Sequence, residues 1–185
     1  IDALIDDFAA GGAGRFNHLG HWADPSSDPL GIPLQEAQLQ MVEVLVDLAG
    51  IHDGATVLDV GSGFGGTLEA LDRRFCDVAL VGLEIDARQL ALCRSVAASP
   101  GNHITWLQAD ACALPLADRS VDHVLSIEAM WHFPSREAFL AEAGQVMSLD
   151  SVRRFNLPPD LVLFNRITFG LNAIFQRLGA SDNWH

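Results

Sequence analysis

The chain has 185 residues and a formal net charge of −13 at pH 7, with 11 basic residues against 24 acidic ones. This balance excludes nucleic acid as the main partner, because neutralising phosphates requires a basic face. All the basic residues are arginine, and the absence of lysine excludes P-loop NTPases and Schiff-base enzymes.

The first 33 residues are predicted to form a short helix followed by a loop, because Gly, Asp, Pro and Ser are frequent there. Residues 34–48 carry apolar side chains at helical spacing, and Gly50 is typical of a helix end. The residues predicted to share the buried face of this helix are Leu34, Ala37, Met41, Leu45 and Leu48.

Strand-like and helix-like segments then alternate. Apolar runs predict strands at 55–60, 78–85, 103–107 and 121–127. Helical spacing predicts helices at 67–75, 87–98 and 135–147, the last with Ser135 as its N-cap. Strands that alternate with helices of about a dozen residues predict an α/β fold with a Rossmann-like, doubly wound and mainly parallel sheet.

The pattern changes after Met147. Residues 1–150 carry seven arginines and 22 acidic residues, whereas residues 151–185 carry four arginines and two acidic residues. Apolar residues at helical spacing predict a helix over 161–178. We therefore expect a cap and helix at 1–50, a ligand-binding core at 51–148, and a helical tail at 149–185 that forms a lid or a homodimer contact.

A glycine-rich loop follows the first predicted strand, with glycines at 61, 63, 65 and 66. The pattern Gly61-x-Gly63-x-x-Gly66 matches a nucleotide-binding fingerprint, in which the backbone turns sharply and approaches the ligand closely. Glu84 ends the next predicted strand, where an acid can accept hydrogen bonds from both hydroxyls of a ribose. These features predict a ligand that contains a nucleoside.

Two further acids indicate the charge of that ligand. Asp59 immediately precedes the loop region, where a carboxylate would repel a pyrophosphate. Asp110 follows the third predicted strand and can accept a hydrogen bond from an adenine amino group. Three acids at one sheet edge predict a pocket for a positively charged nucleoside. S-adenosylmethionine, which has a sulfonium and an α-amino group, fits this description.

Four segments, in order, resemble the class I S-adenosylmethionine-dependent methyltransferases of the small-molecule "type 11" branch. Residues 58–65 are similar to the first motif of that family, 82–86 to its ribose-binding motif, 109–111 to its adenine-contacting motif and 126–134 to its fourth-strand motif. Residues 18–22 are similar to a segment of the N-terminal cap. The residues that we expect to bind S-adenosylmethionine are Asp59, Gly61, Ser62, Gly63, Gly65, Glu84, Ile85, Gln89, Asp110, Ala111 and Ser126.

The resemblance also implies a small-molecule acceptor near the fourth-strand motif. His132 is the predicted general base for a hydroxyl acceptor. Glu128 would orient the methionine part of the cofactor or stabilise a cation that develops on a carbon acceptor. Trp131 and Phe133 are expected to wall an apolar pocket. Methylation of oxygen is slightly favoured over methylation of carbon.

Two other functions remain open from the sequence. An NAD-dependent oxidoreductase would need a substrate domain that the short tail cannot provide. A non-catalytic nucleoside-binding module is favoured if the sheet ends after its fourth strand, a point that the sequence leaves open because no further strand pattern follows residue 147.

The remaining composition predicts a cytoplasmic protein without a metal site or a membrane span. The three cysteines, Cys76, Cys93 and Cys112, are too few and too scattered for a disulfide framework or a four-thiolate zinc site. No metal-ligand spacing occurs. No apolar run approaches the roughly 18 residues that a membrane span requires.

Overall fold

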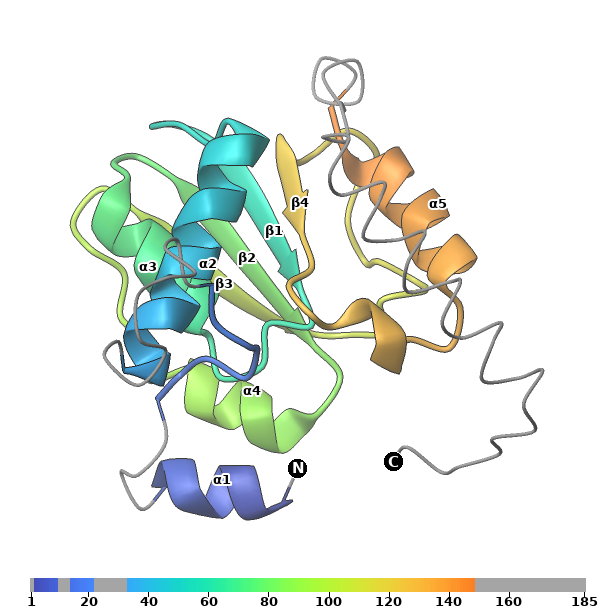
Figure 1. Cartoon of the computed structure of the whole chain (residues 1–185). Helices are drawn as coiled ribbons and strands as arrows, with labels where there is room; N and C mark the ends of the chain where they lie inside the picture. Colours follow the sequence, from blue (N-terminus) through green and yellow to red (C-terminus); the bar gives the residue numbers. More distant parts are fainter. Residues whose placement is uncertain (1, 10–13, 22–32, 149–185) are drawn as a thin grey trace. The chain divides into compact units, whose positions relative to one another are not determined.

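The apolar runs form a four-stranded sheet in the computed structural model, which describes residues 2–9, 14–21 and 33–148 (Figure 1). The strands are β1 (Thr56–Val60), β2 (Ala79–Glu84), β3 (His103–Gln108) and β4 (His123–Leu125). All pairings are parallel, and the strand order is β3-β2-β1-β4. The predicted α/β fold with a parallel sheet is confirmed.

The order of the strands reverses beside β1. The chain adds β2 and then β3 on one side of β1, and β4 lies on the other side. Asp59 of β1 is in register with Gly82 of β2 and Leu125 of β4. Open parallel sheets bind ligands at the carboxyl ends of the strands where the order reverses. Asp59 therefore occupies the part of the sheet where a ligand is expected.

Helices cover both faces of the sheet (Figure 1). The helices of the described residues are α1 (Asp2–Ala9), α2 (Leu34–Ala49), α3 (Gly66–Arg74), α4 (Ala87–Cys93), the 3₁₀ helix η1 (Met130–His132) and α5 (Arg136–Val146). Val57 packs with residues of α2 and α3 in one buried cluster, and Leu58 packs with Phe139 of α5 in another. β1 is thus buried on both faces, as is usual for strands of a parallel sheet.

The buried face of α2 differs from the prediction. Leu34 and Leu48 are 54% and 58% exposed, so their predicted burial is wrong. The buried residues of the helix are Ala37, Gln38, Val42 and Val46. Val42 and Val46 belong to the cluster that covers the sheet, and the amide of Gln38 is buried because it donates to the carbonyls of Phe16 and His18. The prediction was right for Ala37, which is fully buried, and wrong for Leu34 and Leu48 near the two ends of the helix.

Two elements are shorter than predicted. α4 ends at Cys93 rather than at residue 98, because the hydroxyl of Ser95 bonds to the carbonyl of Leu92 at 2.6 Å and competes with the helical pattern. β4 has three residues, because the chain leaves the sheet after Leu125 and reaches a left-handed backbone conformation at Glu128 (φ +50°). The predicted N-cap is confirmed, since the hydroxyl of Ser135 accepts the N–H of Ala138 at 3.1 Å.

The chain returns to β4 after α5. Met147 forms an isolated parallel bridge with Val121, and the N–H of Ser148 donates to the carbonyl of Val121 at 2.8 Å. All described residues belong to one compact unit, Ile1–Val152. The predicted tail helix at 161–178 lies outside the described residues. Within the described ranges, no helix has the length and apolar character needed to cross a bilayer.

Candidate functional site

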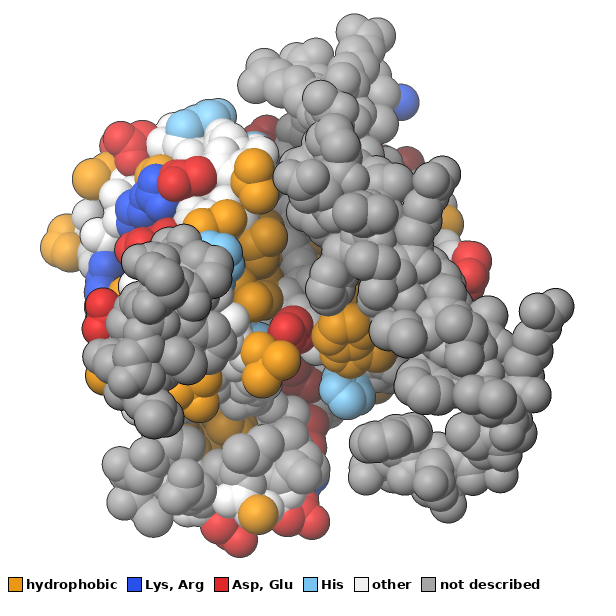
Figure 2. Space-filling view, viewed as in Figure 1, with side chains coloured by type: hydrophobic (Ala, Val, Ile, Leu, Met, Phe, Trp, Pro, Cys, Tyr) orange, Lys and Arg blue, Asp and Glu red, His pale blue; other side chains and the backbone are white. Residues whose placement is uncertain are grey.

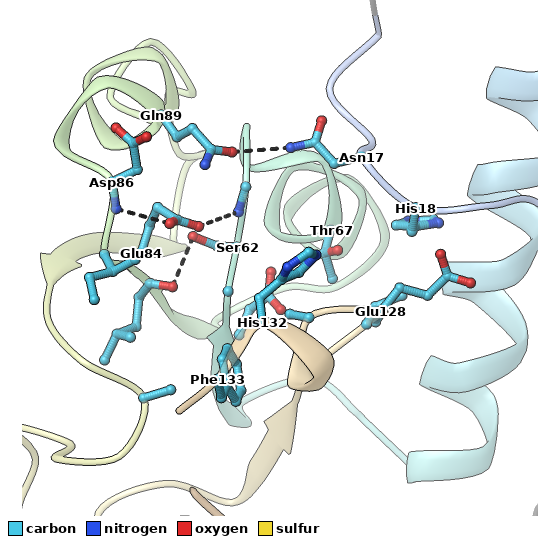
Figure 3. Close-up of a pocket in the computed structure, with 18 of the residues that line it drawn as sticks. Asn17, His18, Ser62, Thr67, Glu84, Asp86, Gln89, Glu128, His132 and Phe133 are labelled. Carbon is cyan, nitrogen blue, oxygen red and sulfur yellow. Dashed lines mark hydrogen bonds between the residues drawn. The ribbon is translucent and has the colours of Figure 1, made fainter. Parts of the chain in front are cut away.

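A cavity of about 540 Å³ lies at the carboxyl ends of the strands (Figure 3). The predicted site residues that line it are Asp59, Gly61, Ser62, Gly63, Glu84, Ile85, Gln89, Asp110, Ala111, Glu128 and His132. Gly65 and Ser126 were predicted to bind the same ligand but do not line the cavity. Gly65 precedes α3 and faces the ring of Trp106, and the buried Ser126 hydroxyl has no hydrogen-bond partner among the described residues.

Glu84 is held at the end of β2 by two backbone groups. Its Oε2 accepts the N–H of Gly63 at 3.0 Å, and its Oε1 accepts the N–H of Asp86 at 3.0 Å (Figure 3). The residue is 6% exposed. Each carboxylate oxygen retains a lone-pair position after these contacts. Glu84 is therefore oriented to accept hydrogen bonds from two adjacent hydroxyls of a ligand.

The glycine-rich loop accommodates neighbouring protein segments. Gly61 has φ +78°, and a Cβ there would lie 2.4 Å from the Cβ of Ala129. A Cβ on Gly66 would lie 2.7 Å from the ring of Phe16 and 2.8 Å from the carbonyl oxygen of Arg15. The sequence pattern predicted close approach to a ligand. The structure shows that these two glycines also permit close approach of the loop after β4 and of the N-terminal segment.

Asp59 contributes a buried charge to the cavity. Its side chain is 2% exposed, and Oδ2 has no hydrogen-bond partner among the described residues. Burial, together with the charge of Glu84, raises the pKa of Asp59 to about 7. An unpaired buried carboxylate is unfavourable unless a partner is supplied. A cationic group bound in the cavity would supply that partner.

The third acid, Asp110, is positioned by its own turn. Its Oδ1 accepts the N–H of Cys112 at 2.8 Å, which leaves Oδ2 for another donor. On the α4 side of the cavity, the side-chain amide of Asn17 donates to Oε1 of Gln89 at 3.2 Å. Ile85 is 63% exposed beside this end of the cavity. Asp59, Glu84 and Asp110 thus line one cavity.

Glu128, His132 and Phe133 line the cavity from the loop after β4. Oε2 of Glu128 accepts the N–H of Leu19 at 2.9 Å. The ring of His132 is exposed and makes no hydrogen bond within the described part of the chain. Trp131 is 54% exposed and does not line the cavity, whereas the predicted wall residue Phe133 does.

The N-terminal segment, residues 14–21, completes the cavity with Arg15, Phe16, Asn17 and His18. Arg15 ties the segment to the loop before α3, since its guanidinium donates to the carbonyl of Phe64 at 3.1 Å. Sequence reasoning assigned His18 only to a cap and did not identify the other three. No local sequence pattern marks Arg15 or Asn17 as site residues, because their hydrogen-bond partners are distant in the chain. Phe64 lies 49 positions from Arg15, and Gln89 lies 72 positions from Asn17.

The cysteines do not add chemistry to this cavity. The thiol of Cys93 donates to the carbonyl of Gly63 at 3.0 Å. Burial raises the pKa of Cys93 to about 12, with the charges of Glu84 and Asp59 adding to the effect, so this thiol is not a nucleophile at neutral pH. Among the described residues, no group of three histidine, cysteine or acidic side chains is arranged to hold a metal ion.

Figure 2 gives the distribution of side-chain types over one face of the described residues. Figure 2 shows hydrophobic, acidic and histidine side chains in the middle of this face, with most visible arginines toward the left side. The apolar side chains that line the cavity itself include Phe16, Ile127, Ala129, Phe133 and Pro134. Such a lining, with a few polar groups, is typical of pockets for small molecules.

A family model described as "Methyltransferase domain" matches residues 58–151, which include the glycine-rich loop, Glu84, Asp110 and Glu128. The chain belongs to this methyltransferase family. The family that the four sequence motifs predicted is thus confirmed.

Two relatives of this methyltransferase show how far the similarity extends. Methyltransferase GfsG of Streptomyces halstedii is 36% identical over 132 residues, which are 70% of this chain and 46% of that protein. Fatty-acid O-methyltransferase of Mycolicibacterium smegmatis is 31% identical over 138 residues, which are 71% of this chain and 48% of that protein. The chain therefore spans about half the length of these relatives.

The fold of the methyltransferase is also similar to that of a solved structure, the cyclopropane synthase MmaA2 from Mycobacterium tuberculosis. The TM-score is 0.61 at 25% sequence identity, over 71% of this chain and 45% of that one. The similarity supports the Rossmann-like class of the fold.

Proposed function

We propose that this methyltransferase transfers a methyl group from S-adenosylmethionine to a hydroxyl oxygen of a small, largely apolar molecule. The observation that carries the proposal is Asp59. Its buried Oδ2 lacks a partner among the described residues, and Asp59 lines a cavity whose acids Glu84 and Asp110 suit a nucleoside. A cationic nucleoside satisfies all three acids together.

The residues present fit this cofactor. Glu84 would accept the two ribose hydroxyls, Asp110 would accept the adenine amino group, and Asp59 would face the positively charged methionine part. The cofactor supplies an electrophilic methyl group bound to a positively charged sulfur. A nicotinamide dinucleotide fits less well, because its pyrophosphate would approach the carboxylates of Asp59 and Glu84.

The nature of the acceptor follows from the remaining residues that line the cavity. Phe133, Ile127 and Phe16 provide apolar walls, and His132 and Glu128 provide polar groups. The named relatives leave both oxygen and carbon acceptors open, since one is a fatty-acid O-methyltransferase and the solved neighbour is a cyclopropane synthase. We favour oxygen because an imidazole is available to take the proton of a hydroxyl. His132 then contacts the acceptor, and Glu128 holds the loop that carries it.

Calorimetry with S-adenosylmethionine, S-adenosylhomocysteine and NAD⁺ tests the cofactor. We expect both sulfur nucleosides to bind and NAD⁺ not to bind. Binding of NAD⁺ alone would favour an oxidoreductase instead. Binding of S-adenosylhomocysteine without methyl transfer to any of a broad set of hydroxylated and unsaturated acceptors would favour a non-catalytic binding module.

Product analysis distinguishes oxygen from carbon methylation. S-adenosylmethionine with a ¹³C-labelled methyl group is incubated with the protein and with each acceptor, and the product is examined by ¹³C NMR. A methyl resonance in the methoxy region supports the proposal. A resonance in the aliphatic C-methyl region contradicts the preference for oxygen but leaves methyl transfer intact.

A further inference from the structure

His18 lines the cavity, and one of its imidazole nitrogens is buried beside it without a hydrogen-bond partner among the described residues. The residue is 8% exposed, it lines the cavity, and its Nε2 has no hydrogen-bond partner among the described residues. A buried polar atom without a partner is unfavourable, so one that belongs to a cavity-lining residue points to a polar group of a ligand. Neither the sequence motifs nor the proposed function uses this nitrogen.

The other ring nitrogen determines the proton position on His18. Nδ1 lies 2.7 Å from the carbonyl oxygen of Leu19. A carbonyl oxygen can only accept, so Nδ1 must carry the proton in this contact. In the neutral ring, Nε2 is then the bare nitrogen, with a lone pair available to a donor. This is the tautomer that a general base acting through Nε2 requires.

The ring of His18 is held in place. Its own backbone carbonyl accepts the side-chain amide of Gln38 on α2, and the next backbone N–H, that of Leu19, donates to Glu128. The ring also contacts that of Phe16, with centroids 5.2 Å apart. His132 has no comparable support, because its ring is exposed and unbonded within the described residues. The fixed orientation of its ring favours His18 over His132 as the general base, since proximity and alignment determine the efficiency of proton transfer.

His18 lies at the end of the cavity away from the nucleoside-binding acid. In Figure 3, His18 and Glu128 lie on one side, and Glu84, Asp86 and Gln89 lie on the opposite side. The contact between Leu19 and Glu128 shows that the N-terminal segment and the loop after β4 meet at this end. A ribose bound to Glu84 would leave this end for the methyl acceptor.

We infer that His18, rather than His132, is the general base that takes the proton of the acceptor hydroxyl. The inference rests on the proposed function. The hydroxyl oxygen forms the new bond to the methyl carbon as the carbon–sulfur bond breaks with its electron pair going to sulfur. The hydroxyl proton goes to Nε2 of His18, and the imidazolium releases it to water after the product leaves.

Two variants test the role of Nε2. Asparagine in H18N keeps an amide N–H near the position of Nδ1, where it can donate to the carbonyl of Leu19, and removes the unpartnered Nε2. H52N is the matched control, because Nδ1 of His52 makes the same local contact with the carbonyl of Asp53, at 2.8 Å, on an exposed loop outside the cavity. We expect both variants to bind S-adenosylhomocysteine within about twofold of the wild type, as for substitutions that remove no ligand contact.

Long-range ¹H–¹⁵N spectra of the histidine rings test the tautomer without an acceptor. The wild-type protein is saturated with S-adenosylhomocysteine at pH 8, and H18N identifies the resonances of His18. We expect a protonated Nδ1 and an unprotonated Nε2. A protonated Nε2 on His18 under these conditions overturns the inference.

Turnover of two probe acceptors, 1-octanol and octanoate, tests the proton transfer. Octanoate is already ionised at neutral pH and needs no base, whereas the alcohol does. We expect H18N to lose 10²-fold or more in kcat with 1-octanol, about the contribution of a general base, and H52N to lose nothing. With octanoate, we expect H18N to stay within about threefold of the wild type, since no proton is transferred.

The other outcomes separate the two proposals. Normal turnover of 1-octanol by H18N, loss of S-adenosylhomocysteine binding in H18N, or wild-type activity on octanoate alone each overturns the role of His18. Failure of the wild type to bind S-adenosylhomocysteine, or to methylate any member of the broad acceptor set described above, overturns the proposed function instead.

Discussion

The backbone N–H of Leu19 donates a hydrogen bond of 2.9 Å to Oε2 of Glu128, although the two residues are 109 positions apart in the chain. The bond joins the N-terminal segment to the loop after β4. Glu128 makes this contact from a left-handed backbone conformation, with φ +50°. That conformation costs a non-glycine residue about 1–2 kcal/mol. The contact with Leu19 thus helps to hold the loop in a conformation that its own backbone disfavours.

Replacement of Glu128 by glycine or by alanine separates the side-chain contact from the backbone strain. Both variants lose the carboxylate, but only glycine adopts φ +50° without a steric penalty. We expect E128G to have a free energy of unfolding about 1 kcal/mol higher than that of E128A. Urea unfolding followed by circular dichroism measures the difference. Equal stability of the two variants would show that the left-handed conformation is not maintained in solution.

Gly66 allows the N-terminal segment to approach the start of α3. Alanine at a helical position is normally favoured over glycine by about 1 kcal/mol. At Gly66 the added Cβ would meet Phe16 and Arg15, so we expect G66A to displace this segment. The expected result is faster cleavage by trypsin after Arg15. G144A is the control, because a Cβ at Gly144 of α5 has nothing within 4 Å, and it should be stabilised by about 0.5–1 kcal/mol. Cleavage of G66A at the wild-type rate would contradict the close contact.

The order of strands and helices could be read from the sequence because each buried strand is a short apolar run. Val57 and Leu58 face opposite sides of the sheet, and both sides are covered, so neither side required polar alternation. The buried face of α2 could not be predicted from the sequence in the same way. Leu34 and Leu48 are as apolar as Val42 and Val46, and only the packing against the sheet selects the latter pair.

The candidate site was predictable where a residue type and its strand position were sufficient. Asp59, Glu84 and Asp110 follow from the ends of three parallel strands, which must meet at one edge. The contribution of residues 15–18 was not predictable, because it depends on contacts with α4 and with the loop after β4. The left-handed conformation of Glu128 likewise has no local sequence signal.

Glu84 should recognise ribose hydroxyls. We expect E84A to lose the preference of the wild type for adenosine over 2′,3′-dideoxyadenosine, because each hydrogen bond to a charged group contributes roughly 1.5–3 kcal/mol. Calorimetric titration of both nucleosides gives the preference directly, independent of any loosening of the loop at Gly63. E142A is the control, since Glu142 binds the N–H of Leu114 and does not line the cavity. A preference that persists in E84A would remove Glu84 from the ribose site.

The stability of the ligand-free protein should fall with pH because of Asp59. Burial, with the charge of Glu84, raises the pKa of Asp59 from 3.8 to about 7 in the folded protein. Between these two values, the unfolded chain releases the proton while the folded protein retains it. The contribution of Asp59 to the free energy of unfolding is therefore complete below pH 3.8, decreases up to about pH 7 and is constant above. Urea unfolding of D59N should show a smaller decrease over this window than the wild type.

Ligand binding should have the opposite pH dependence. A cationic ligand requires the ionised form of Asp59, so the affinity for S-adenosylmethionine should rise by up to about tenfold for each pH unit below 7 and level off above it. The control ligand is adenosine, which lacks the charged methionine part and should bind with an affinity that changes little over this range. D59N should weaken S-adenosylmethionine at pH 8 and remove its pH dependence, while adenosine binding stays the same. Equal pH profiles for the two ligands on the wild type would show that Asp59 does not face the cation.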